Sequence, residues 1–167
     1  MASNVPTVRQ IAWASVIPQI LLIGIFIYIF YLLNIGDPFI FGALTYLILS
    51  FGLKYIFTSA HRKGINLVKQ QKFADAIHYF EKSADFFFKN SWIDKYRFLT
   101  LLSPSKMSYR EMGLCNIAFC YSQIGNGLKA IEFYQQTLKD YPENGMAKAG
   151  LNMLNSLDDK SQSVESN

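Results

Sequence analysis

Charge is nearly absent from this chain as far as Ala60. From Gln10 to Gly36 there is no Asp, Glu, Lys or Arg, and from Pro38 to Ala60 only Lys54 is charged. A helix rises about 1.5 Å per residue, so roughly 20 residues cross the hydrocarbon core of a bilayer. We therefore expect two transmembrane helices, at residues 10–33 and 39–60, joined by a short loop at 34–38.

The length of the first apolar stretch argues against a cleaved signal peptide, whose apolar region has roughly 7 to 15 residues. Arg9 precedes this stretch, and Lys54, Arg62 and Lys63 flank the end of the second, whereas the loop between them has no basic residue. Basic residues favour the cytosolic side of a membrane. We expect an integral, multi-pass membrane protein with both termini in the cytosol, and with residues 1–9 as a cytosolic segment. The content of Ile, Phe, Lys and Asn favours a bacterial inner membrane.

Groups that could carry catalysis are also scarce. The chain has two His and two Cys, and it contains no metal-binding, nucleophile-elbow or phosphate-loop motif. On a helix, Cys115 and Cys120 would point away from each other, so they cannot pair locally. We expect both to be small apolar packing residues, and we predict no enzymatic activity, no metal and no cofactor.

Three residues of the first stretch are expected at an intramembrane helix contact, namely Pro18, Gln19 and Gly24. Pro18 lacks a backbone donor and usually kinks a helix. Hydrocarbon would leave the Gln19 amide unsatisfied, so Gln19 should face protein. It could belong to a polar path or form a hydrogen bond to the second stretch near Thr45 or Ser50. We favour the hydrogen bond, because neither stretch has an ionisable group in its middle.

The segment after Ala60 has about 107 residues, which suits one small domain. One series of intervals between apolar residues occurs in it twice, first from Gly64 and again from Ala118. Small and large apolar residues at such intervals are typical of two antiparallel helices in close contact, which stack on neighbouring pairs. The copies are Gly64, Leu67, Phe73, Ala76, Phe80 and Ala118, Tyr121, Gly127, Ala130, Tyr134.

At these residues the chain resembles the tetratricopeptide repeat family, whose unit is a helix-turn-helix of about 34 residues. The second copy matches better and adds Gly125, Pro142 and Asn144, whereas the first has Gln71 where the family often has Gly. The resemblance covers roughly residues 57–144. It implies an all-α fold in which a transmembrane hairpin precedes a short repeat domain.

The expected limits of this domain follow from the two copies. The first repeat takes about 57–87, an insertion 88–110, the second repeat 111–144 and a capping helix 145–157, so the domain as a whole covers 57–157, and residues 158–167 are a disordered tail. No turn cluster separates the second apolar stretch from the first repeat, so we expect one unbroken helix there. The insertion is rich in aromatic residues and predicts a short helix opened by Ser91 and stopped near Pro104. It either rests on lipid headgroups, grips a partner or covers the end of the repeat array.

In tetratricopeptide proteins the first helix of each repeat lines a groove that receives a peptide or a partner helix. The resemblance implies a mostly apolar, neutral groove here, suited to other proteins such as the juxtamembrane segment of a membrane protein. Alternatively the insertion or the tail fills the groove, and these residues are core. The equivalent residues are His61, Ile65, Val68, Lys69, Met112, Cys115, Asn116, Phe119, Ser122 and Gln123.

These patterns lead to two hypotheses of different classes. The first is a membrane-anchored adaptor or scaffold that presents the repeat domain to other proteins on the cytosolic face. The alternative is a small accessory or assembly subunit of a membrane transport or secretion complex, whose hairpin packs against other transmembrane helices. The basic residues form no cluster, which argues against binding to nucleic acid.

Overall fold

The structure is a computed structural model that describes residues 13–165. These residues form helices joined by turns and short loops, without a β-strand, so the predicted all-α class is confirmed. The predicted cytosolic segment 1–9, the start of the predicted first span at 10–12 and the end of the predicted tail at 166–167 lie outside the described residues. The chain divides into two compact units, one built from residues up to Ser59 and from 89–108, the other from 60–88 and from Tyr109 onward.

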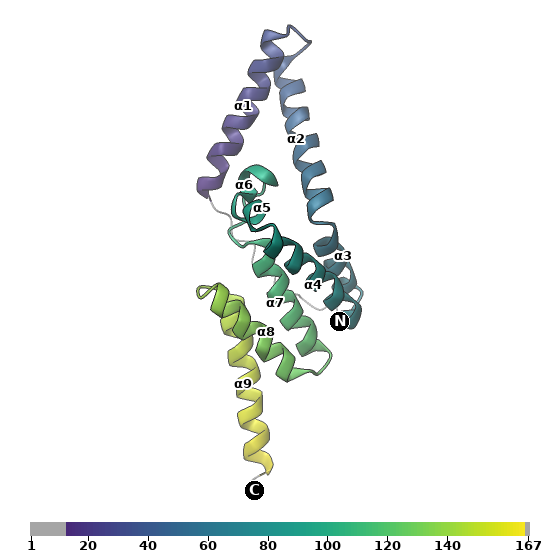
Figure 1. The fold of residues 1–167 in the computed structure, drawn as a ribbon, viewed down its shortest axis with the longest axis vertical. Coiled ribbons are helices and arrows are strands. Elements are labelled where there is room, and N and C mark those ends of the chain that lie inside the picture. Colours follow the sequence, from purple (N-terminus) through teal and green to yellow (C-terminus); the bar gives the residue numbers. More distant parts are fainter. Residues whose placement is uncertain (1–12, 166–167) are drawn as a thin grey trace. The chain divides into compact units, whose positions relative to one another are not determined.

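The first unit contains an antiparallel pair of helices, α1 (Val16–Leu32) and α2 (Pro38–Phe57) (Figure 1). A 3-10 turn, η1 (Trp13–Ser15), precedes α1. Two short helices complete the unit, α5 (Ser91–Lys95) and α6 (Arg97–Thr100), and α6 contacts α1. The predicted insertion is therefore part of the same compact unit as the hairpin.

The start of α1 differs from the prediction at Pro18. The α-helix begins at Val16, so Pro18 occupies its first turn, where the backbone N–H groups have no partner within the helix. The missing donor therefore costs nothing at this position. The predicted kink is wrong, because the α-helix starts only two residues before the proline.

The start of α2 has a clear local cause. Asp37 is extended, with φ −84° and ψ 108°, and its Oδ1 accepts hydrogen bonds from the backbone N–H groups of Phe39 and Ile40 at 2.9 and 3.2 Å. Pro38 follows at the first helical position, which needs no donor. An acidic cap followed by proline ends the loop at 33–37 and starts the second helix.

The expectation of one unbroken helix beyond the second apolar stretch is wrong. α2 ends at Phe57, and α3 (Ser59–Lys69) begins after the single residue Thr58. The Thr58 hydroxyl donates to the Lys54 carbonyl at 2.7 Å, and a hydroxyl bonded to the carbonyl four residues earlier often bends a helix. One residue thus interrupts the helix without forming a loop.

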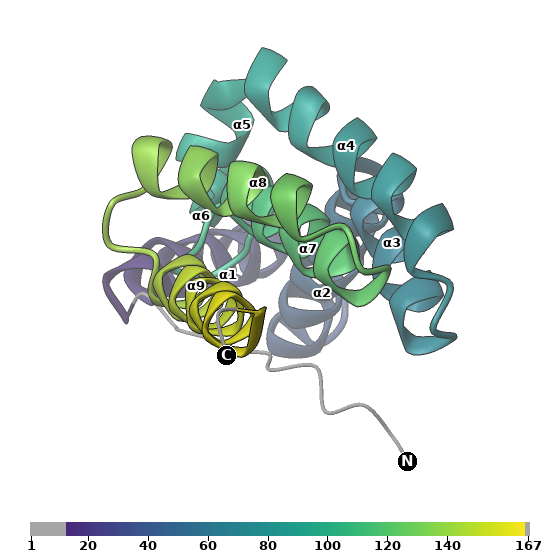
Figure 2. The same cartoon turned by 90° about the horizontal axis from the view of Figure 1, so that it is seen from below.

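The second unit consists of α3 from Ala60 on, α4 (Phe73–Lys89), α7 (Tyr109–Gln123), α8 (Gly127–Asp140) and α9 (Gly145–Glu165). α7, α8 and α9 are successive neighbours (Figures 1 and 2). Ring contacts join the other helices, since His61 of α3 touches Phe80 of α4 and Tyr109 of α7. The largest fully buried side chains of this unit are Phe80, Phe87, Ile117, Thr137, Cys120 and Ser83.

Two boundaries in the C-terminal half differ from expectation. The insertion contains two short helices, which Tyr96 separates, in place of one. α9 extends to Glu165, so residues 158–165 of the predicted tail lie within this helix. No Pro or Gly follows Gly150, and the residues beyond it contain nothing that would stop a helix.

The turns after α3 and after α7 have the same backbone geometry. In the first, the N–H of Lys72 donates to the Leu67 carbonyl and that of Gln71 to the Val68 carbonyl. In the second, Asn126 donates to Tyr121 and Gly125 to Ser122. Both are Schellman turns with a left-handed residue, Gln71 at φ +60° and Gly125 at φ +77°. Each donor and each acceptor of the first turn has its counterpart at the equivalent position of the second.

Candidate functional site

The outer surface of the α1/α2 hairpin is apolar and exposed. α2, with 20 residues, is long and apolar enough to cross a membrane, whereas α1 has 17 residues and falls short of that length. In a water-soluble protein such side chains would normally be buried. The most exposed apolar side chains of the hairpin are Ile17, Ile20, Leu21, Tyr31, Phe39, Ile40, Ile48, Phe51, Tyr55 and Ile56.

Inside the hairpin, the two helices approach each other closely at Gly42. A Cβ added there would lie 2.7 Å from a side-chain carbon of Ile27 and 2.8 Å from its backbone nitrogen. Gly42 is buried, and no larger residue fits without a shift of backbone. The predicted contact residue Gly24 is instead exposed, with nothing within 4 Å of an added Cβ. Gly24 therefore does not touch α2, because the face of α1 that carries it points away from α2.

Gln19 forms the predicted hydrogen bond across the hairpin, but to a different residue. Its Oε1 accepts from the Tyr46 hydroxyl at 3.3 Å, next to the expected Thr45. Its buried Nε2 has no hydrogen-bond partner among the residues that the structure describes. Gln19 therefore joins α1 to α2 through one half of its amide.

The repeat-packing residues divide into three groups. Gly64, Ala76, Phe80, Ala118, Ala130 and Tyr134 are buried, and a Cβ on Gly64 would lie 2.7 Å from the Phe80 ring. Leu67, Phe73, Tyr121 and Gly127 are half-buried. Gly125 and Pro142 are exposed and belong to turns, so these two residues reverse the direction of the chain and do not contribute to packing. An added Cβ on Gly127 would meet nothing, because this residue begins α8.

Only some residues of the predicted groove are accessible. His61, Val68 and Cys115 are buried in the core, so they cannot receive a partner. Phe119 is half-buried and its ring meets that of Phe73 edge-on at 6.0 Å. Exposure is greatest at Lys69 and Gln123, while Ile65, Met112, Asn116 and Ser122 are half-buried. We use the term α3/α7 face for the accessible part, Ile65, Lys69, Met112, Asn116, Ser122 and Gln123.

Burial also shifts the pKa values of the ionisable groups in this core. It lowers the pKa of His61 from 6.5 to about 4, and within residues 13–165 the Nδ1 of this imidazole has no hydrogen-bond partner. Burial, together with the nearby Glu111 carboxylate, raises the pKa of the Cys115 thiol to about 12. Burial raises the pKa of Cys120 to the same value. At neutral pH, the imidazole is uncharged and both thiols are protonated.

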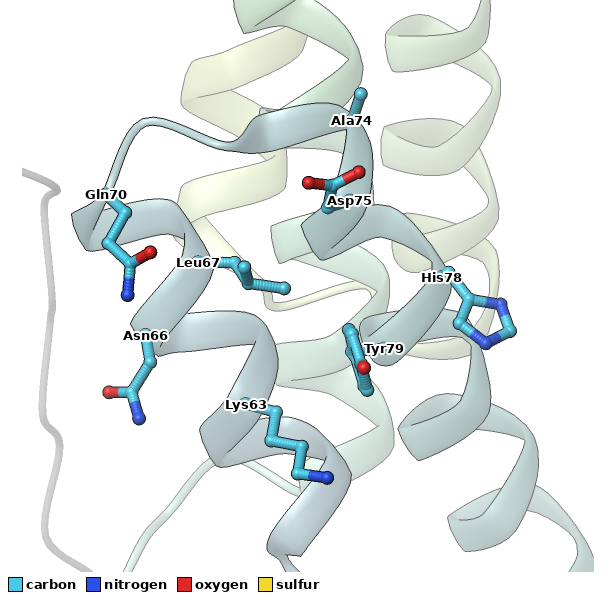
Figure 3. A pocket seen from close by; sticks show the side chains of 8 residues that line it. All are labelled: Lys63, Asn66, Leu67, Gln70, Ala74, Asp75, His78 and Tyr79. Carbon is cyan, nitrogen blue, oxygen red and sulfur yellow. The ribbon is translucent and has the colours of Figure 1, made fainter.

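A hollow lies between α3 and α4, on residues of α3 that do not belong to the predicted groove (Figure 3). Leu67 and Tyr79 lie between the two helices, and the Lys63 ammonium is 5.8 Å from the Tyr79 ring centre. The side chains of Asp75 and His78 point in different directions (Figure 3). The polar side chains around this hollow therefore do not converge on one point. Its lining is completed by Asn66, Gln70 and Ala74.

Sequence reasoning missed two packing residues and the contacts of a third. Gly42 is one, and Gly150 is another, since a Cβ there would lie 2.5 Å from the Tyr134 ring. Asn144 is the third: its Oδ1 accepts from the Ala147 N–H at 2.7 Å, and its Nδ2 donates to Glu111 at 2.8 Å. The family pattern includes Asn144 but does not say what it binds.

No protein family, curated protein or solved structure matches this chain. Its function must therefore be inferred from its own residues.

Proposed function

We propose that this chain is a membrane-anchored scaffold. The α1/α2 hairpin inserts into a bilayer, both termini face the cytosol, and the second unit binds other proteins beside the membrane. The observation that carries this proposal is the exposed apolar surface of α2, which has 20 residues and a single charge, Lys54, near its C-terminal end. Water would be a poor solvent for this surface, and hydrocarbon a good one.

The two helices would enter the bilayer together. α1 alone rises roughly 26 Å over its 17 residues, somewhat less than the hydrocarbon core of about 30 Å. The preceding turn η1 and a locally thinner bilayer would make up the difference. The close packing at Gly42 and the hydrogen bond between Gln19 and Tyr46 hold α1 against α2, so insertion of one helix favours insertion of the other.

The second unit suits a tetratricopeptide-like role. The α3/α4 and α7/α8 pairs have the same Schellman turn at equivalent positions. A glycine lies at a close contact within the first pair, and a glycine of α9 lies against the second pair. The first helices of the two pairs, α3 and α7, leave the α3/α7 face accessible to a peptide or a helix of another protein. Holding such a partner at the membrane raises its effective concentration there without any chemistry.

The test is affinity capture of the full chain from gently solubilised membranes. One variant carries Ile65→Glu and Gln123→Arg on the α3/α7 face, and a matched control carries Gln70→Glu and Gln136→Arg, which are exposed elsewhere on the same helical unit. Neither variant changes the core, and circular dichroism would check folding. The scaffold hypothesis predicts that specific partners are lost only from the α3/α7 variant.

If the α3/α7 variant keeps its partners, the scaffold proposal is wrong. The matching experiment on the hairpin is Gly24→Leu, a change on an open face of α1. Loss of partners from this variant alone would favour the accessory-subunit hypothesis, in which the hairpin packs laterally against other transmembrane helices.

A further inference from the structure

The segment α5–α6 exposes apolar side chains outside the hairpin itself. Trp92, Tyr96 and Leu99 are 59%, 46% and 49% exposed, although the segment is anchored by buried Ile93 and Leu101. α5 buries Ile93, Leu101 is buried directly after α6, and the exposed apolar side chains of the two short helices present a second apolar surface. Neither the scaffold role nor the packing of the hairpin makes use of it.

The position of this surface on the hairpin indicates the kind of partner that covers it. α6 contacts α1, and Figure 1 shows it toward the end of the hairpin that is opposite the loop at 33–37. That end carries Lys54 of α2, whereas the loop end carries Asp37. If the hairpin spans a bilayer, the end with Lys54 is where the chain leaves the hydrocarbon, so α5–α6 lies at the level of the headgroups.

The charge of the segment matches an anionic surface. Residues 89–108 contain four basic residues and one acidic residue, and that acidic residue, Asp94, is buried. Lys95 and Lys106 are exposed. Arg97 donates to the backbone carbonyls of Asp94, Ser105 and Lys106, which are neutral acceptors, so these contacts leave its positive charge in place. Basic side chains beside exposed Trp and Tyr are typical of segments that bind the interface of anionic membranes.

We propose that α5–α6 is an interfacial lipid-binding platform selective for anionic phospholipid. Trp92, Tyr96 and Leu99 enter the boundary between headgroups and acyl chains, and Lys95 and Lys106 contact lipid phosphates. The contacts of Arg97 hold the two helices and the following loop in one shape, so the platform is formed before it meets lipid. This inference rests on the proposed membrane anchor, and it assigns a lipid surface, not a protein, to the insertion.

The test uses the fluorescence of Trp92 in the full-length chain. The chain has two Trp, so Trp13→Phe leaves Trp92 as the single reporter. The protein is reconstituted into vesicles of phosphatidylcholine, or of equal parts phosphatidylcholine and phosphatidylglycerol, that contain lipids brominated either near the headgroup or near the end of the acyl chain. The expected result is quenching of Trp92 several-fold stronger by the shallow bromines than by the deep ones, and strongest with brominated phosphatidylglycerol.

A second reporter separates this inference from the anchor itself. Ile48 lies on the exposed face of α2 near the middle of the helix, so Ile48→Trp in a chain with both native Trp replaced by Phe reports on the span. Deep quenching at position 48 with Trp92 open to aqueous acrylamide would keep the anchor and overturn the lipid platform, leaving the surface to a protein partner. Absence of quenching at both positions would overturn both proposals.

A separate variant tests the contribution of the lysine charges to lipid binding. Lys95→Gln with Lys106→Gln should reduce the shallow quenching of Trp92 in phosphatidylglycerol vesicles to the level seen in phosphatidylcholine. Gln keeps much of the length and polarity of Lys, and neither ammonium is buried, so the fold of the segment is not at risk. Equal quenching in both vesicle types by the unmodified lysine protein would contradict selectivity for anionic lipid.

Discussion

Gln71 and Gly125 occupy the same place in two turns of identical hydrogen bonding, and both have a left-handed backbone. This conformation costs a residue with a Cβ roughly 1–2 kcal/mol, while for glycine the cost is small. Glycine, however, costs up to about 1 kcal/mol through the greater freedom of the unfolded chain. The first turn therefore carries a conformational cost that the second avoids.

Exchanging the residues between the two turns tests this equivalence. Gln71→Gly should raise the free energy of unfolding by up to about 1 kcal/mol, and Gly125→Gln should lower it by a similar amount. Urea unfolding of the full chain in mild detergent measures both. Both side chains are exposed, so no packing is lost in either variant. A stabilising Gly125→Gln would show that the two turns are not equivalent in solution.

The packing of the hairpin predicts a difference between a matched pair of glycines. Gly42→Ala places a Cβ against the backbone of Ile27 and should destabilise the hairpin by about 1–3 kcal/mol, as overpacking does. Gly24→Ala meets only open space and should be neutral or slightly stabilising. Thermal melting in detergent, followed by near-ultraviolet circular dichroism, compares the two. Equal melting temperatures would exclude the close contact at Gly42.

Burial of His61 predicts a dependence of stability on pH. Its imidazole lies edge-on to the rings of Phe80 and Tyr109, at centroid distances of 5.4 and 5.6 Å, and burial lowers its pKa to about 4. Between that value and 6.5 the unfolded chain binds the proton more readily than the folded one. The stability contributed by the neutral imidazole is therefore complete above about pH 6.5 and is lost as the pH falls toward 4.

The size of this effect is about 3 kcal/mol at most, from the difference between a pKa of 6.5 and one of about 4. His61→Phe keeps a ring between Phe80 and Tyr109 and should abolish this part of the pH dependence. The control is His78→Gln, since His78 is exposed and should leave the dependence as it is. Chemical denaturation at a series of pH values measures the slope, and an unchanged slope in His61→Phe would refute the assignment.

Asn144 joins the start of α9 to Glu111 of α7 and is 4% exposed. Asn144→Ala removes a helix cap and a hydrogen bond to a carboxylate, so it should cost about 2–3 kcal/mol. Asn144→Asp keeps the cap but sets two carboxylates side by side. It should be destabilised at neutral pH and recover in mild acid, as denaturation at both conditions would show; no recovery would contradict the contact with Glu111.

Local features of the fold were predictable from the sequence. The spacing of Gly64 and Phe80 predicts their contact, because a small residue and an aromatic residue at this interval are typical of one antiparallel helix pair. The helix class, the turn at Gly125 and the start of a short helix at Ser91 likewise follow from short-range rules.

Rotation of the helices about their axes could not be predicted. The hairpin helices are apolar on every side, so nothing in the sequence says that Gly42, and not Gly24, faces the partner helix. The predicted groove failed for a related reason at His61 and Cys115, where the choice between surface and core depends on the neighbouring helix. The extent of α9 was missed because polar residues are compatible with both a helix and a tail.

Anchoring in a membrane is the central claim, and labelling of single introduced cysteines tests it most directly. Cys115 and Cys120 are buried and have a pKa of about 12, so the native chain should react little with a maleimide. Ile35→Cys places an exposed thiol in the hairpin loop, and Lys82→Cys places one on α4. Both positions are accessible in the protein itself, so only a membrane would protect one of them.

The measurement is labelling by a membrane-impermeant maleimide in right-side-out vesicles, before and after the membrane is opened by detergent. We predict that Ile35→Cys is labelled in intact vesicles, and that Lys82→Cys is labelled only after detergent is added. Equal labelling of the two variants in intact vesicles would contradict a hairpin that crosses the bilayer.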